Sequence, residues 1–318
     1  MSEPQSSPPK NADHVLILVN PKAGRQSASE KVGQLAALLN RRSFHVEVSN
    51  NLDHVCRTAN EAYRHGVLRA LVGVGGDGTA AELVNRTEPG LPICLFPSGT
   101  GNLLAGYLKL PDSPQRVCRA IEQGSLLKMD AGLASGRIFL LMASCGLDAD
   151  VVYEVHRRRH RVSGGHLTRW SYVKPILDAV RSYQYPEIRV YWDRATGVQG
   201  EQDSDALCAR WVFVSNVPPY GWGMRLVPWA VGTDGELDLC TFDGGWLWNG
   251  LRYLAAAQLG WLRHLRDCRV ARVTRLRIAS DRPVMYQLDG DPGGWLPLEI
   301  EALPGRLTLV VPASTKAS

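Results

Sequence analysis

Three glycine-rich segments are the parts of this sequence best suited to chemistry. They are residues 20–24 (NPKAG), 75–79 (GGDGT) and 97–102 (PSGTGN), and each follows an apolar run and leads into a helical pattern. Glycine lets a backbone approach a ligand closely, and clustered N–H groups at helix N-termini attract anions. If the apolar runs are parallel strands, all three segments lie at the carboxyl edge of one sheet. Together they predict a polyphosphate site, whereas each segment alone also fits an ordinary tight turn.

Residues 73–78 also match the G-x-G-x-x-G spacing of dinucleotide-binding folds, which is a weak signal alone. No acidic residue ends the next apolar run, where such folds place a carboxylate for the ribose, and no Walker-type P-loop pattern occurs. Asp77 stands among the glycines, where its charge would repel phosphate unless a cation bridges them or the carboxylate acts on a proton. This arrangement favours phosphoryl transfer over hydride transfer.

The elements that must position these segments follow two patterns. Over about the first 130 residues, short apolar runs alternate with amphipathic stretches, which indicates βαβ units and a parallel sheet. Here Asp53 is expected to cap a helix that stops at Gly66. Beyond these residues the pattern changes to strands, several of which alternate as half-exposed antiparallel strands do. The expected strands are residues 15–19, 45–48, 68–74, 92–96, 137–143, 187–192, 209–216, 236–242, 269–279, 296–302 and 306–311, and the later helices are residues 171–182 and 246–264.

We therefore predict an α/β N-terminal domain with a parallel sheet, a C-terminal β-rich antiparallel sandwich domain, and an active site in the cleft between them. The expected boundaries are residues 1–12 for a disordered tail, 13–135 for the nucleotide-binding domain, 136–312 for the β-rich domain and 313–318 for a second tail. The last strand either stays in the second domain or returns to the first.

A series of motifs resembles the diacylglycerol kinase catalytic-domain family, which includes bacterial lipid kinases and the sphingosine and ceramide kinases. After the three glycine-rich segments come residues 144–149 (SCGLDA), 220–228 (YGWGMRLVP), 234–238 (DGELD) and 288–291 (LDGD). The resemblance covers nearly the whole chain and implies a fold like that of NAD kinases and diacylglycerol kinases. The GGDGT segment is shared with NAD kinases, whereas SGTGN at residues 98–102 has the lipid-kinase form.

The resemblance implies an ATP-dependent lipid kinase that phosphorylates the hydroxyl of a diacylglycerol- or sphingoid-like lipid. Asp77 would hold Mg²⁺, directly or through water, or serve as the base, and Asp291 is the first choice for the acceptor of the hydroxyl proton. The residues that the resemblance places around ATP are Asn20, Ser49, Gly75, Gly76, Asp77, Gly78, Thr79 and Thr100.

Two positions depart from the family pattern. Many bacterial relatives have Glu where Asp291 stands, so the shorter side chain shifts the hydroxyl, adds a water or marks a weaker enzyme; a simple turn residue is the alternative. Leu103 stands where bacterial diacylglycerol kinases often have Asp, which leaves the acceptor open. Asp234 resembles the ligand of a structural Mg²⁺ site that also uses the backbone carbonyls of Val231 and Glu236, and a metal-free Asp-Gly hairpin is the alternative.

The sequence defines the residues that contact the lipid or the membrane less well than those around the nucleotide. The net charge of +5 suits an anionic nucleotide or an anionic membrane surface. The densest basic run, residues 156–161 (HRRRHR), precedes Arg169, Trp170 and Tyr172, which suits transient contact with a membrane; a solvated helix face is the alternative, and nucleic-acid binding is poorly supported. Residues 246–264 are rich in Trp and Leu, for which core packing is favoured over a lipid groove.

Targeting signals are missing from the sequence. No run reaches the roughly 18–20 apolar residues of a membrane span, and the polar N-terminus does not resemble a signal peptide. The seven scattered cysteines suit buried thiols in a reducing cytosol. We therefore expect a cytoplasmic enzyme peripheral to the membrane, with a homodimer left open. The competing functions are a soluble NAD-kinase-type kinase and a non-catalytic nucleotide- or lipid-binding descendant.

Overall fold

The computed structural model describes residues 11–20, 26–99, 101–161, 183–192, 206–221 and 224–313. The chain forms two compact units whose segments alternate along the sequence. Unit 1 comprises Met1–Ala131, Gly232–Gly235 and Leu303–Ser318, and unit 2 comprises Gly132–Val231 and Glu236–Ala302.

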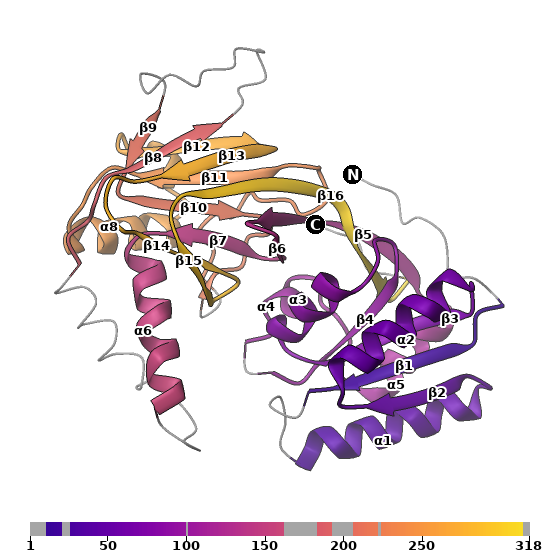
Figure 1. Ribbon diagram of the computed structural model, residues 1–318. Helices are drawn as coiled ribbons and strands as arrows, with labels where there is room; N and C mark the ends of the chain where they lie inside the picture. The colour runs from indigo at the N-terminus through magenta and orange to yellow at the C-terminus, as the bar shows by residue number, and fades with distance from the viewer. Residues whose placement is uncertain are drawn as a thin grey trace. The chain divides into compact units, whose positions relative to one another are not determined.

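Unit 1 is built on a parallel sheet (Figure 1). The strands lie in the order β2 (His45–Ser49), β1 (His14–Val19), β3 (Leu68–Gly75) and β4 (Pro92–Pro97), followed by the second half of β16 (Leu298–Val311). Every residue of β3 is buried, as expected for a strand covered on both faces. Thr308 and Leu309 of β16 pair in parallel with Pro92 and Ile93 of β4. The parallel α/β architecture predicted from the sequence is therefore confirmed.

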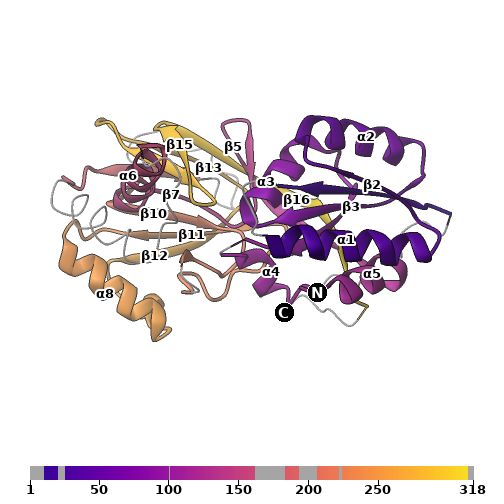
Figure 2. The same cartoon turned by 90° about the horizontal axis from the view of Figure 1, so that it is seen from below.

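The described residues of unit 1 form five helices, which cover both faces of this sheet. The helices α2 and α3 lie on one face, and α1 and α5 lie on the other (Figure 2). The core on the second side includes Val15, Leu35, Phe96 and Ile121. The helices are α1 (Gln26–Arg41), α2 (Leu52–Arg64), α3 (Asp77–Arg86), α4 (Leu103–Tyr107) and α5 (Pro114–Gln123).

The limits of α2 differ slightly from the prediction. The N-cap is Asn51, whose side-chain oxygen accepts the backbone N–H of His54 at 3.0 Å. Asp53 was the wrong choice because it lies inside the first turn, where its charge favours the helix dipole and its carboxylate contacts Arg86 at 3.2 Å. The helix stops before Gly66, which has a φ of 71°, as predicted.

Unit 2 contains two antiparallel sheets that share one core. The first has the order β12 (Cys268–Val273), β11 (Leu237–Phe242), β10 (Trp211–Ser215), β7 (Met142–Cys145), β14 (Met285–Leu288) and β15 (Asp291–Trp295). The second has the first half of β16, then β13 (Arg275–Ala279), β8 (Ile188–Trp192) and β9 (Leu207–Ala209). Val212 and Leu239 of the first sheet and Val190 and Ile278 of the second belong to the same buried cluster. The predicted C-terminal antiparallel β domain is confirmed.

Further elements join or flank these sheets. The strand β5 (Ser125–Ala134) pairs with β6 (Arg137–Phe139) and also with β16. The helices of unit 2 within the described residues are α6 (Leu147–Arg161), α8 (Leu247–Gln258) and the short 3₁₀ helix η4 (Leu262–His264).

Several predicted elements have different limits. The stretch 269–279 is divided between β12 and β13, which belong to different sheets, and 137–143 is likewise divided between β6 and β7. Conversely, 296–302 and 306–311 form the single strand β16. The expected helix 246–264 is interrupted at Gly260, whose φ of 71° cannot continue a helix. The expected helix 171–182 lies outside the described residues.

Candidate functional site

Hydrogen bonds join the three glycine-rich segments at the carboxyl edge of the unit 1 sheet. The side-chain amide of Asn20, just after β1, donates to Thr79 Oγ1 in α3 at 3.0 Å. The backbone N–H of Ser98, just after β4, donates to the carbonyl of Gly75 at the end of β3 at 3.0 Å. The structure thus brings together parts of the segments that the sequence analysis selected separately.

Glycine is required at the contact between the second and third segments. A Cβ atom on Gly99 would lie 2.8 Å from the Cα atom of Gly76 and 2.9 Å from Asn102 Oδ1. The two backbones therefore approach more closely than any side chain allows. Gly76 is also the N-cap of α3 and has no side chain to cap the first N–H groups of this helix, although the N–H of Thr79 donates to the Gly76 carbonyl at 3.0 Å. This combination fits an anionic group such as phosphate.

Asp77 links the second and third segments through its carboxylate. One oxygen accepts the backbone N–H of Leu103 at 2.9 Å and the other accepts that of Leu104 at 3.0 Å, so the side chain caps the first turn of α4. Each carboxylate oxygen has two lone-pair sites, and one on each oxygen is therefore still available to a cation or to water. Asn102 fixes the same loop, because its side chain both accepts from and donates to the backbone of Gly99.

The remaining predicted nucleotide residues lie at or beyond this edge. Ser49 ends β2 and accepts the backbone N–H of Asn51 at 3.2 Å. Gly78 lies in the first turn of α3, where an added Cβ would meet nothing within 4 Å. Thr100 lies outside the described residues. The carboxyl edge therefore gathers the described nucleotide residues on unit 1, and their individual roles stay predictions.

The LDGD motif of unit 2 forms the turn between β14 and β15. Asp289 has a φ of 52°, and its carboxylate accepts the backbone N–H groups of Leu140, Leu141 and Met142 at 2.7, 2.8 and 3.0 Å. Asp289 therefore holds this turn against residues 140–142.

Asp291, two residues later, is held in a different way. Its side chain is 47% exposed, and one carboxylate oxygen contacts Nη2 of Arg137 at 3.2 Å. The described contacts of the Asp291 carboxylate are thus with a side chain, whereas those of Asp289 are with backbone N–H groups. The role of Asp291 as proton acceptor stays a prediction, and so does the alternative of a simple turn residue.

A partly buried polar network is connected to this turn, and no role was assigned to it from the sequence. The carboxylate of Asp148 accepts hydrogen bonds from the hydroxyls of Ser144 and Tyr220 and from the amide of Gln287. The amide oxygen of Gln287 accepts the backbone N–H of Gly290 at 2.7 Å, which connects the network to the turn that carries Asp291. The signal in the sequence was an aspartate and a serine within the otherwise apolar run 139–149.

Burial dominates the electrostatics of this network. Desolvation raises the pKa of Asp148, although the hydrogen bonds from Ser144, Tyr220 and Gln287 act in the opposite direction. Desolvation and the neighbouring Asp148 carboxylate also raise the pKa of Tyr220, which therefore keeps its proton and remains a donor.

The predicted structural metal site lies on a turn that a hydrogen bond within the protein already holds in place. The buried Asp130 on β5 accepts the backbone N–H groups of Gly235 and Gly305, both at 2.7 Å. Among the described residues, no group of three or more His, Cys, Asp and Glu side chains could hold a metal ion. A site built from Asp234 and the carbonyls of Val231 and Glu236 would need only one such side chain, so it stays a prediction.

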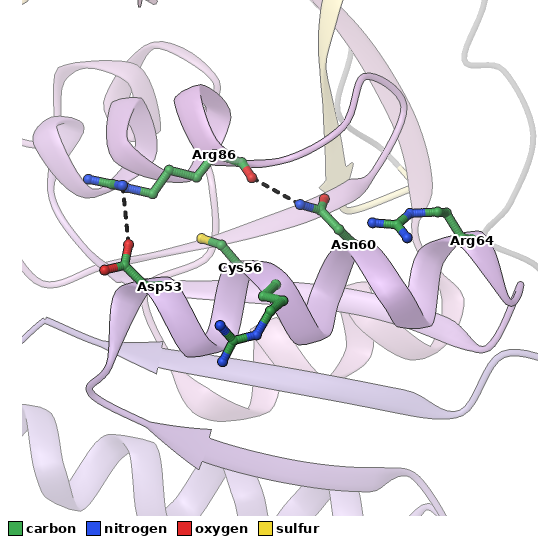
Figure 3. Close-up of a pocket in the computed structure, with 6 residues that line it drawn as sticks. Asp53, Cys56, Asn60, Arg64 and Arg86 are labelled. Carbon is green, nitrogen blue, oxygen red and sulfur yellow. Dashed lines mark hydrogen bonds and ion pairs between the residues drawn. The ribbon is translucent and has the colours of Figure 1, made fainter.

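A pocket of about 270 Å³ lies between α2 and α3, away from the glycine-rich loops. Figure 3 shows its lining residues, which are Asp53, Cys56, Arg57, Asn60, Arg64 and Arg86. Two of its arginines are neutralised nearby: Arg86 pairs with Asp53 and Glu82, and Arg64 pairs with Glu88. Burial raises the pKa of the Cys56 thiol to about 11, so it is a poor nucleophile. We therefore assign the candidate site to the loops and not to this pocket.

Across the described residues, none of the helices combines the length and the apolar character that a membrane span requires.

Two family models match the chain. The diacylglycerol kinase catalytic domain matches residues 14–134, and the YegS C-terminal NAD kinase beta sandwich-like domain matches residues 142–311. Relatives include a diacylglycerol kinase of Bacillus subtilis, 24% identical with 93% of this chain and 95% of that protein covered. Another is a probable YegS-like lipid kinase of Stenotrophomonas maltophilia, 28% identical with coverages of 81% and 83%.

Solved structures have the same fold. A putative diacylglycerol kinase of Bacillus anthracis matches with a TM-score of 0.70 at 19% identity, covering 98% of this chain and 99% of that one. An NAD kinase of Archaeoglobus fulgidus in complex with ATP matches with a TM-score of 0.50 at 14% identity, with coverages of 93% and 92%. From its matched domains and relatives, we conclude that the chain belongs to the diacylglycerol kinase family that includes the YegS-like lipid kinases.

Proposed function

We propose that this protein transfers the γ-phosphoryl group of ATP to the hydroxyl of a diacylglycerol- or sphingoid-like lipid. The proposal rests on one observation. Hydrogen bonds connect the glycine-rich loops at the carboxyl edge of the unit 1 sheet, and Asp77 is fixed among these loops. Membership of a lipid kinase family supports the reaction type. The ATP complex of the archaeal NAD kinase, which shares the fold, supports ATP as the nucleotide.

Unit 1 would bind the nucleotide. The backbone N–H groups of Gly76 and Gly78 and the start of α3 would receive the phosphates, because glycine leaves this backbone uncovered. Thr79, positioned by its hydrogen bond from Asn20, would border the same phosphates. The full set proposed around ATP is Asn20, Ser49, Gly75, Gly76, Asp77, Gly78, Thr79 and Thr100.

Asp77 fits the requirements of a magnesium ligand, because hard cations prefer carboxylate oxygens and both of its oxygens keep a lone-pair site. Mg²⁺ bound there with ATP would neutralise the negative charge that develops on the phosphates. Asp234, with the carbonyls of Val231 and Glu236, would hold a second, structural Mg²⁺.

Asp291 would accept the proton during transfer. The lipid hydroxyl oxygen forms a bond to the γ-phosphorus, the bond to the β-phosphate oxygen breaks, and the hydroxyl proton passes to the Asp291 carboxylate. ADP leaves with the electron pair of the broken bond. Arg137 would orient this carboxylate through the contact described above.

A lipid acceptor requires the enzyme to reach a membrane surface. We therefore propose a cytoplasmic protein that contacts anionic membranes transiently, in keeping with its net charge of +5.

The test is a transfer assay with γ-labelled ATP, Mg²⁺ and mixed micelles that contain diacylglycerol, ceramide, sphingosine or phosphatidylglycerol. We expect label in the organic phase with one of the first three lipids. Label on NAD supplied as acceptor would instead support an NAD-kinase-type enzyme. Nucleotide protection without any transfer would support a non-catalytic descendant.

Two variants test the assigned roles. Asp77→Asn and Asp291→Asn should each lower kcat by about 10²–10⁴-fold while the far-UV circular dichroism spectrum is unchanged. Normal turnover by both variants would show that the roles are wrong even if the lipid kinase activity is present.

A further inference from the structure

The helix α8 and the residues at its two ends expose several large apolar side chains. Their outward residues are between 37% and 71% exposed, a range unusual for such large side chains. We call this set the α8 surface, and it consists of Trp246, Trp248, Leu251, Leu254, Leu259 and Trp261. Core packing was the favoured interpretation of residues 246–264 from the sequence. That interpretation is wrong for these six side chains, because they are exposed.

The opposite face of α8 explains why this surface points outward. Tyr253 stacks on Phe242 of β11 with ring centroids 4.1 Å apart, and its hydroxyl donates to Asp267 at 2.6 Å. Ala256 and Ala257 are buried on the same side. The helix is therefore anchored to unit 2 through a tyrosine and small residues, while its larger apolar side chains face away. Figure 2 shows α8, in orange, at the margin of unit 2 beside β12.

Spacing places the outward residues on one stripe. Trp248, Leu251, Ala255 and Leu259 are separated by three or four positions each, so they lie on one side of the helix. Trp246 and Trp261 lie just beyond its two ends. Tryptophan and leucine in this arrangement are typical of helices that lie flat in the interfacial region of a bilayer.

The charge around the α8 surface is positive. Residues 246–273 contain five arginines and a single acidic residue, Asp267. Asp267 contacts Arg252, Glu236 pairs with Arg272 at 3.1 Å, and Arg263 lies over the ring of Trp229 at 4.1 Å, so three of the five arginines have fixed partners. An apolar stripe with cations beside it complements anionic headgroups above acyl chains.

The basic run on α6 is a weaker candidate for the same contact. Arg157 and Arg158 both contact Glu154 at 2.9 Å, so part of that charge is neutralised, as it is for Arg252 and Arg272 near the α8 surface. The described residues of α6 also lack exposed tryptophans.

We propose that the α8 surface is where this protein docks on an anionic lipid bilayer. This inference rests on the proposed lipid kinase function, which requires access to a membrane-held acceptor. The three tryptophans would lie at the headgroup level, the leucines below them, and the nearby arginines would contact the headgroup phosphates.

The test measures binding of the full chain to vesicles of phosphatidylcholine with or without phosphatidylglycerol, in the absence of ATP. Wild-type protein should sediment with the anionic vesicles, and brominated acyl chains should quench its tryptophan fluorescence. The double variant Trp248→Ala/Leu251→Ala should bind about tenfold or more weakly, because it removes two large side chains from the contact.

The matched control is Trp295→Ala, which removes a tryptophan that is 56% exposed on β15 of the same unit. This variant should bind vesicles as the wild type does. Both variants should keep wild-type transfer to acceptors in detergent micelles, where docking on a bilayer is not needed.

Three outcomes would overturn the inference. In the first, the wild-type protein does not bind anionic vesicles. In the second, the double variant binds them as tightly as the wild type does. In the third, the wild-type protein is a dimer in analytical sedimentation and the double variant is a monomer. The last outcome would assign the surface to a second copy of the chain. Normal vesicle binding without any lipid phosphorylation would instead contradict the proposed function, and the proposal for the docking surface would still hold.

Discussion

At the level of single residues, the aspartates of the candidate site differ in what their oxygens accept. Asp77 and Asp289 both accept backbone N–H groups, which fixes loops through charge-assisted hydrogen bonds. Asp148 is partly buried among hydroxyl and amide donors, and Asp291 is half-exposed beside an arginine. The same side-chain chemistry therefore serves structure in some positions and is available for reaction in others.

This difference predicts unequal losses of stability for two neighbouring substitutions. Asp289→Asn keeps the preference for a positive φ but replaces one acceptor oxygen with a donor that faces backbone N–H groups. It should lower the free energy of unfolding by about 1–3 kcal/mol, measured by urea denaturation. Asp291→Asn is the matched control and should leave that free energy nearly unchanged. Equal stability of the two variants would contradict the structural role of Asp289.

The partly buried Asp148 predicts a particular dependence of stability on pH. Its pKa is raised in the folded state from the ordinary value of 3.8, so between these two values the folded state keeps a proton that the unfolded state loses. The stability contributed by this group is present at low pH and is lost as the pH rises through the raised pKa. Asp148→Asn removes this titration, so its Tm relative to wild type should rise as the pH increases above 3.8. A difference that stays constant or falls would contradict the raised pKa.

At the level of elements, the close contact between the loops after β3 and β4 decides whether the candidate site forms. Gly99→Ala places a methyl group 2.8 Å from the Cα atom of Gly76, and backbone on one side of the contact must move. We expect weaker ATP binding by about tenfold or more in calorimetry, with the fold retained.

A second glycine supplies the matched control. Gly33 lies within α1, and a Cβ added there would meet nothing within 4 Å. Gly33→Ala should raise the free energy of unfolding by about 0.5–1 kcal/mol and leave ATP affinity unchanged. If both substitutions left the affinity for ATP unchanged, the loop contact would not be part of the nucleotide site.

Patterns within an element were readable from the sequence, whereas pairing between elements was not. The run that became β3 was recognisable because apolar residues continue along it, and Arg275 and Arg277 alternate visibly with buried neighbours in β13. The division of 269–279 between two sheets depends on partners far away in the chain, namely β11 for β12 and β16 for β13. Local alternation carries no information about such partners.

The candidate site shows the same limit. The glycine-rich loops were found because glycine and strand-to-helix spacing are local signals. The contact of Arg137 with Asp291 spans 154 positions, and that of Gly305 with Asp130 spans 175. Neither contact has a local signature, so both had to come from the structure.

At the level of the whole molecule, the two units are built from interleaved parts of the chain. The second half of β16 pairs with β4, and Arg306 donates to the carbonyls of Val84 and Thr87 at the end of α3, both at 2.6 Å. Val310 belongs to the core between the sheet and α1. Unit 1 is therefore incomplete without a segment that follows unit 2 in the sequence.

This dependence predicts the behaviour of fragments. Residues 11–134 expressed alone should aggregate or melt without cooperativity, because the edge of β4 and the apolar residues beneath it are uncovered. The same fragment joined to residues 303–313 by a flexible linker should be monomeric and melt cooperatively, as followed by circular dichroism. A cooperative melt of the shorter fragment at the same temperature would show that β16 is dispensable for unit 1.

The late position of this strand has a consequence for how the protein is made. Residues 303–311 leave the ribosome after all of unit 2. The N-terminal segment of unit 1 therefore lacks its last strand while the intervening residues are translated, which takes roughly 10–30 s. Throughout that time the nascent chain presents an open apolar edge to the cell. The order of synthesis therefore makes this protein a natural client for chaperones that bind at the ribosome.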